Sequence, residues 1–205
     1  MQSLTSLAGL CPLLFLLASC SDAPKVTEEK PRPKPPVALT GRQAFQQMYP
    51  QARGWAPDAE PLEIRSVNLA QVKAEPGKAG AWQVVFVSPT RGKAKTYTYS
   101  SVESDGNLHQ GVFGGLEETY TARGDESPFS IVAIKVDSDE AYQTAAARSS
   151  EYMKKNPGKP VIFLMTQNRR FPDVTWRVIW GDSVGTSDYS VFVDGTTGKL
   201  LQIMH

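Results

Sequence analysis

The sequence predicts an α+β protein in which a helix followed by antiparallel strands occurs twice. The first observation is a β-hairpin near the end of the chain, where residues 176–181 and 189–194, rich in aromatic and β-branched residues, flank a polar turn. The second is an earlier stretch of the same design, which begins at Trp82 and resumes after a turn at Tyr97. The third is that apolar residues at helical spacing precede each set of strands. This order of elements is typical of the α+β class.

The two stretches indicate an internal duplication. Both begin with Trp-x-Val, and the spacing from Trp to Tyr differs by two residues, which a hairpin loop would absorb. We therefore expect tandem repeats over residues 40–125 and 126–205, in one sheet or in two. Aligned without gaps, residues 97–110 and 189–202 match Tyr97 with Tyr189, Gly106 with Gly198, Leu108 with Leu200 and Gln110 with Gln202.

The first repeat is expected to open with a helix. Thr40 and Gln43 have the spacing of a capping box, and Pro50 is expected to bend or end the helix near Tyr49. Strands are predicted over 62–72, 82–87, 95–102 and 108–113, with 114–127 as a polar connecting loop. The apolar face of the helix comprises Ala44, Phe45, Met48, Tyr49 and Ala52.

The second repeat is expected to contain a strand over 129–136, a helix that runs from the Asp137 cap to about Lys155, and strands over 161–166, 176–180, 189–193 and 199–204. Alternation places Trp176, Val178 and Trp180 on one face of a strand, most simply between sheet and helix. If that face were open to solvent instead, it would be a platform for a peptide or glycan.

The first residues predict export. Residues 7–17 are apolar apart from Gly9, Cys11 and Pro12, which is too short for a membrane-spanning helix but fits a secretory signal. We assign residues 1–19 to this signal peptide. Residues 20–39 contain five prolines among alternating Lys, Arg and Glu, and are expected to form a disordered, extended tether.

Leu17-Ala18-Ser19-Cys20 resembles the lipobox of bacterial lipoproteins. The resemblance implies cleavage between Ser19 and Cys20, a diacylglyceryl group on the Cys20 thiol, and acylation of the new amine, so that palmitate is incorporated. Ser21 rather than Asp at the next position implies, by resemblance to Gram-negative lipoproteins, an anchor in the outer membrane that faces the periplasm. The alternative is an exported protein with an unmodified Cys20. The absence of Lys and Arg from the first seven residues departs from the usual signal.

The last turn carries a second resemblance. Residues 193–200, Val-Asp-Gly-Thr-Thr-Gly-Lys-Leu, and the order of elements before them resemble the PepSY domain over about 135–205. The likeness over 40–113 is fainter, with Asp105-Gly106-Asn107-Leu108 as the counterpart. PepSY domains occur in protease propeptides and envelope proteins, so the resemblance implies an inhibitory or chaperone-like role.

Composition and motifs favour binding over catalysis. Lys plus Arg is 22 and Asp plus Glu is 21, which gives no electrostatic basis for binding nucleic acid. Only two histidines occur, and no spacing typical of metal, thiol, serine-hydrolase or phosphate-loop sites is present. Asp137, Asp139 and Glu140 suit helix capping better than a cation site. With Cys11 in the signal and Cys20 lipidated, we expect neither a disulfide nor a thiolate site, and no cofactor or metal.

The sequence therefore favours a non-enzymatic, lipid-anchored cell-envelope protein that binds another envelope protein by adding a strand to a sheet edge. The alternative is a protease inhibitor or regulator of PepSY type. A hydrolase with an unrecognised site is a third possibility. The basic pair Arg169-Arg170 is interpreted as solvated surface.

Overall fold

The computed structural model describes residues 35–106, 108–122, 125–187 and 189–205. The signal peptide (residues 1–19) and residues 20–34 of the tether, which include the cleavage residues Ser19 and Cys20, lie outside the described residues, so those predictions stay predictions. The folded part begins before residue 40, because Ala38 is buried and Leu39 exchanges two backbone hydrogen bonds with Ala79.

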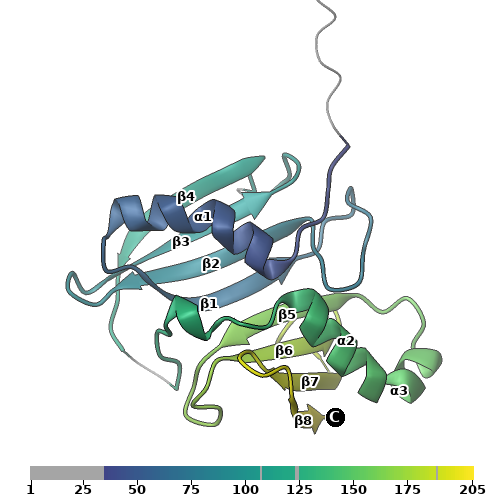
Figure 1. Ribbon diagram of the computed structural model, residues 1–205. Helices are drawn as coiled ribbons and strands as arrows, with labels where there is room; N and C mark the ends of the chain where they lie inside the picture. Colours follow the sequence, from purple (N-terminus) through teal and green to yellow (C-terminus); the bar gives the residue numbers. More distant parts are fainter. Residues whose placement is uncertain (1–34, 107, 123–124, 188) are drawn as a thin grey trace, which may run out of the picture. The chain divides into compact units, whose positions relative to one another are not determined.

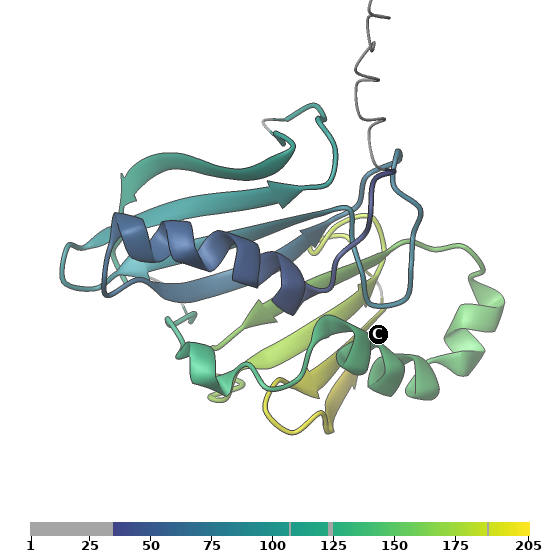
Figure 2. The same cartoon turned by 45° about the horizontal axis from the view of Figure 1, so that its top comes forward.

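The strands form one eight-stranded antiparallel sheet in the order β4-β3-β2-β1-β5-β6-β7-β8. Helices α1 and α2 lie over the same face of it (Figures 1 and 2). The predicted α+β class is confirmed. The strands of both halves belong to one sheet, not to two. The elements are α1 (Gly41–Trp55), β1 (Glu60–Val67), β2 (Ala81–Ser88), β3 (Lys93–Ser100), β4 (Gly111–Thr119), the 3-10 helix η1 (Ile131–Ala133), α2 (Ser138–Arg148), α3 (Ser150–Lys155), β5 (Val161–Thr166), β6 (Thr175–Trp180), β7 (Tyr189–Asp194) and β8 (Leu200–Met204).

Both helix starts are confirmed. The Thr40 hydroxyl accepts from the Gln43 N–H at 3.3 Å, and the Gln43 side chain accepts from the Thr40 N–H at 3.1 Å. Asp137 and Glu140 form the same reciprocal pair at the start of α2. Of the two outcomes expected at Pro50, a bend or an end of the helix, the end near Tyr49 is wrong, because α1 continues through Pro50 to Trp55. Its buried face, which includes Met48 and Ala52, continues across the proline and packs on β2 and β3.

Three other predictions are wrong for local reasons. Residues 129–136 form no strand: Phe129 and Val136 are buried, but the chain between them turns through η1. Residues 114–119 are not a loop but most of β4. The sequence did not predict this part of the edge strand, because its polar residues lack the apolar alternation of a half-buried strand. The helix after Asp137 breaks at Ser149, whose hydroxyl donates to the Ala145 carbonyl at 2.7 Å, a bond that bends helices.

The two halves of the sheet repeat one arrangement, a helix followed by four sequential strands. The indole N–H of Trp82 in β2 donates to the Leu39 carbonyl, just before α1, at 2.9 Å. The indole N–H of Trp176 in β6 donates to the Val136 carbonyl, just before α2, also at 2.9 Å. These two tryptophans meet edge to face with ring centres 6.3 Å apart.

The strand pairings correct the gapless alignment of the repeats by two residues. Tyr97 faces Val84, two positions after Trp82, whereas Tyr189 faces Trp180, four positions after Trp176. The counterpart of Tyr97 in the sheet is therefore Val191, which faces Val178. No difference in loop length is needed, and the expected match of the two tyrosines is wrong.

The same registers locate an approximate two-fold axis at the centre of the sheet. Arg65 faces Gln83 in β2, and Leu164 faces Arg177 in β6, so Arg65 and Leu164 hold equivalent places. These two residues also face each other across the β1–β5 pairing. The axis passes between them, and one continuous core extends over both halves on the helix side.

Candidate functional site

The edge strand β4 has apolar side chains open to solvent. Leu116 is 88% exposed and Phe113 is 42% exposed. A sheet edge also presents unpaired backbone N–H and C=O groups, which are a template for another strand. We take the outer edge of β4, with Phe113 and Leu116, as the candidate functional site.

The backbone direction along β4 follows from one hydrogen bond at its end. The Tyr120 N–H donates to the Gly92 carbonyl at 2.9 Å, so Tyr120 points its backbone groups toward the β2–β3 turn. Because the direction of the backbone groups alternates along an antiparallel strand, the N–H and C=O of Glu118 also point toward β3. The N–H and C=O of Glu117 and Thr119 point away from β3. The free donors and acceptors at this end of β4 therefore belong to Glu117 and Thr119.

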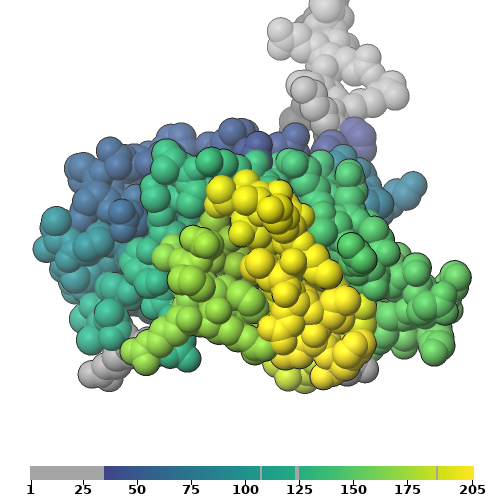
Figure 3. Space-filling model, turned by 60° about the horizontal axis from the view of Figure 1, so that its bottom comes forward, coloured from purple at the N-terminus to yellow at the C-terminus, as the bar shows by residue number. Residues whose placement is uncertain are grey.

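Each edge strand contains a β-bulge beside an exposed leucine. In β4, Gly115 and Leu116 together lie opposite Thr96, because the register shifts between Lys95 and Tyr97. In β8, the extra residue is Leu201, at the shift between Phe192 and Val193. Figure 3 shows the C-terminal segment (yellow) at the surface of the molecule. Bulges prevent indefinite edge-to-edge pairing, so a partner must fit the local irregularity.

The side chain of Glu117 ties β4 to the end of α1 and to the β2–β3 turn. It accepts the indole N–H of Trp55 at 2.8 Å and pairs with Arg91 at 2.7 Å. The Trp55 hydrogen bond, reinforced by the charges of Arg91 and Lys93, lowers the pKa of Glu117. The strand edge is thus anchored to the end of α1, and a rigid edge loses less conformational entropy on binding a partner.

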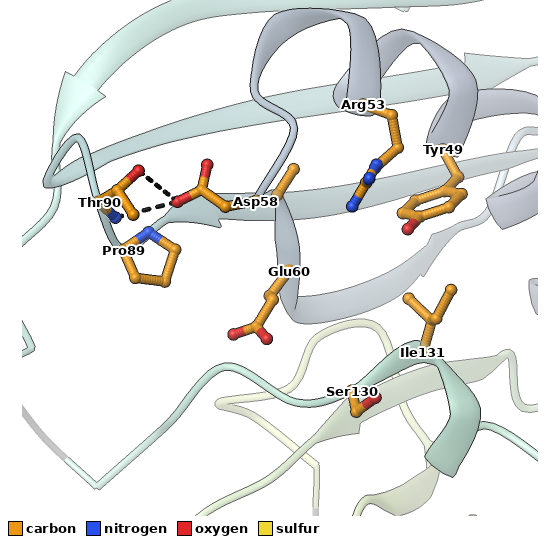
Figure 4. Close-up of a pocket in the computed structure, with 9 residues that line it drawn as sticks. Tyr49, Arg53, Asp58, Glu60, Pro89, Thr90, Ser130 and Ile131 are labelled. Carbon is orange, nitrogen blue, oxygen red and sulfur yellow. Dashed lines mark hydrogen bonds between the residues drawn. The ribbon is translucent and has the colours of Figure 1, made fainter.

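A cavity of about 310 Å³ lies between the end of α1, the β2–β3 turn and η1 (Figure 4). Its most constrained acid is Asp58, which accepts from the Ser88 hydroxyl at 2.7 Å and from the Thr90 hydroxyl and N–H at 2.6 and 3.0 Å. These bonds, that of the Thr90 side chain first, hold the pKa of Asp58 well below its ordinary value. Asp58 is therefore an ionised anchor of the turn and a poor general base.

Asp137 joins the two helix starts. Its carboxylate accepts from the Thr40 hydroxyl at 2.6 Å, the Arg42 N–H at 2.9 Å and the Ser138 N–H at 2.7 Å. The capping interpretation is confirmed and extended, since one carboxylate serves α1 and α2 together. In the described part of the chain no group of three or more His, Cys, Asp or Glu side chains is arranged to hold a metal ion.

The aromatic platform considered from sequence is wrong. Trp82, Trp176 and Trp180 are at most 2% exposed and pack in the core, while Arg177 and Ile179 point to the opposite face as predicted. The sequence reading missed Phe113 and Leu116 because edge strands lack the apolar alternation of half-buried strands. The sequence feature that could have revealed this site is the presence of Phe113 and Leu116 in a stretch otherwise rich in glycine and acidic residues.

No family model matches the sequence, and no curated protein matches it. The crystal structure of a putative lipoprotein (CD1622) from Clostridium difficile 630 is similar, with a TM-score of 0.46 and 10% identity. The similarity covers 78% of this chain and 91% of that one. Within the described ranges, no helix has the length and apolar character to cross a membrane.

Proposed function

We propose that this chain is a non-enzymatic, lipid-anchored protein of the cell envelope that binds an extended segment of another envelope protein along β4. The observation that carries the proposal is the β4 edge, which combines outward backbone groups at Glu117 and Thr119 with the exposed Phe113 and Leu116. Main-chain bonds would supply affinity, and the side chains would supply selectivity.

The proposed partner segment has a definite chemistry. It adds as a ninth strand, places apolar side chains beside Phe113 and Leu116, and brings a cation near the exposed Glu118. Glu117 is unavailable for that role, because its carboxylate is already bound by Trp55 and Arg91. The proposal also takes the two halves as descendants of one PepSY-like unit, with β4 and β8 as its outer ends.

Site-specific photocrosslinking tests the edge. A photoreactive residue at Leu116 should capture a reproducible envelope protein at native abundance, whereas one at Gln46, exposed on α1, should not. Thr119→Pro removes an outward N–H without breaking a bond to β3, so it should abolish capture, and Thr119→Ala should preserve it. Equal capture from Leu116 and Gln46, or a Thr119→Pro variant that still captures, would refute binding at this edge.

Lipid anchoring is tested separately. Palmitate fed to producing cells should label the protein, and Cys20→Ala should remove the label. A label that persists in the variant would exclude Cys20 as the acylated residue. Three acyl chains hold a protein far more firmly than a single chain, so the labelled protein should fractionate with membranes.

The inhibitor alternative makes a different prediction. A protease regulator of PepSY type would suppress one envelope protease at stoichiometric amounts. If the protein captured at Leu116 is a protease and its activity falls at one-to-one stoichiometry, the inhibitor function replaces the proposed non-enzymatic binding function.

A further inference from the structure

Two arginines converge on one phenylalanine ring on the sheet face away from the helices. The guanidinium carbons of Arg170, in the β5–β6 connection, and Arg177, in β6, lie 6.0 and 5.6 Å from the ring centre of Phe192 in β7. Phe171 stacks on Phe192 with ring centres 4.8 Å apart, and Arg170 also lies 5.5 Å from the Phe171 ring centre. Both guanidinium groups therefore lie against this stacked pair of rings.

Neutral side chains hold both guanidinium groups in place. Arg177 Nε donates to the Ser190 hydroxyl at 3.0 Å, and Arg170 Nη2 donates to Gln202 Oε1 at 2.7 Å. Each arginine thereby uses one of its five N–H donors. The bonds orient the planar groups but leave their charges unbalanced.

Neither cation has an ion-pair partner among the residues that the structure describes. Two nearby arginines differ in this respect: Arg169 lies 3.6 Å from Asp125, and Arg65 lies 3.4 Å from Glu63. Arg177 is half-buried, and this burial lowers the pKa of its guanidinium. Placing two like charges by one ring costs free energy that a bound anion would offset.

The arrangement occurs in one half of the sheet only. The positions of Arg177 and Phe192 correspond to Gln83 and Thr98, which face each other between β2 and β3. Since the first half keeps the same fold with neutral polar residues there, the fold does not require the arginines. The cluster is an addition to the scaffold.

We propose that Arg170 and Arg177 form a binding site for a phosphate or phosphomonoester group, held above Phe192. The remaining N–H donors of two planar forks match a tetrahedral dianion with three or four oxygens better than a carboxylate with two. The phosphate belongs either to a small soluble molecule or to a lipid headgroup, which share this chemistry.

The soluble arm is a titration of the full chain with inorganic phosphate and with glycerol phosphate at constant ionic strength, followed by calorimetry and amide NMR shifts. Binding is expected, with shifts centred on Arg177 and Ser190. Arg177→Gln should weaken it by about 10-fold or more, since a bond to a charged group is lost. Arg177→Lys keeps the charge but loses the fork, so it should also weaken binding. Arg65→Gln, on the same face but with its own carboxylate partner, is the matched control and should bind normally.

The lipid arm uses the full chain carrying Cys20→Ala, which has no acyl chains, and compares vesicles of phosphatidic acid with vesicles of phosphatidylcholine, so that any insertion of the apolar residues 7–17 is common to both. Retention on phosphatidic acid that Arg177→Gln abolishes, without soluble binding, assigns the site to a lipid headgroup. Binding in the soluble arm assigns it to a small phosphate. The absence of Arg177-dependent binding in both arms, or an equal loss with Arg65→Gln, would overturn the proposal.

Discussion

Gly41 shows how a single residue is fixed by the contact between the two halves. A β-carbon there would lie 2.7 Å from Cη2 of Trp176 and 3.2 Å from Cη2 of Trp82. Alanine usually stabilises a helix relative to glycine, by about 0.5–1 kcal/mol. Here the buried rings must move, so we expect Gly41→Ala to destabilise the protein by about 1–3 kcal/mol in urea unfolding.

Gly54, in the last turn of the same helix, is the matched control. Nothing lies within 4 Å of a β-carbon built there, so Gly54→Ala should stabilise the protein. Opposite signs for the two substitutions would confirm that Gly41 is required by the tryptophan contact. Stabilisation by Gly41→Ala would contradict the Trp82–Trp176 packing.

Asp137 carries more of the stability than an ordinary helix cap. Its removal leaves the buried Thr40 hydroxyl and the N–H groups of Arg42 and Ser138 without their acceptor. We expect Asp137→Ala to lower the free energy of unfolding by about 2–4 kcal/mol. Asp139→Ala, two residues further on in the first turn of α2, removes a carboxylate bonded only to the Glu140 N–H and should cost less than about 1 kcal/mol. Similar losses in the two variants would refute the double cap.

At the scale of elements, the β2–β3 turn should be sensitive to acid. Asp58 has a lowered pKa in the folded state because Thr90 and Ser88 donate to it. A carboxylate of this kind stabilises the fold above its unfolded pKa of about 3.9, and the stabilisation is lost as pH falls toward the folded value. Stability measured in urea should therefore fall more steeply below about pH 4 in the parent than in Asp58→Asn. Parallel curves would exclude Asp58 as the acid-sensitive group of the turn.

The elements that sequence predicts well are those with local signals. Thr40 with Gln43 and Asp137 with Glu140 define helix starts through bonds between near neighbours, and both are found as expected. β4 was only partly predicted, because the pairing of Gly114 with Tyr97 is decided by β3 and not by the strand's own pattern. The candidate site lies on this strand, so the sequence could suggest edge binding but not which edge.

At the scale of the whole molecule, the approximate two-fold axis depends on pairing between distant segments. No local pattern specifies that Arg65 faces Leu164, and the two-residue error in aligning the repeats could be found only from the strand registers. The Arg170 and Arg177 cluster was missed for the same reason. Arg169-Arg170 looks like a solvated pair in sequence, and only the sheet brings Arg170 to Phe192.

The shared sheet and core predict that both halves unfold together. Phe163 in β5 contacts Trp82 from the first half, at 6.1 Å between ring centres, and Tyr142 from the second, at 6.3 Å. Phe163→Ala should therefore lower the protection of amides in β2 and β6 against hydrogen exchange by the same amount, about 3–5 kcal/mol. Leu116→Ala, at the exposed edge, should change neither. Loss confined to β6 would mean that the two halves are separate folding units joined only at the β1–β5 pairing.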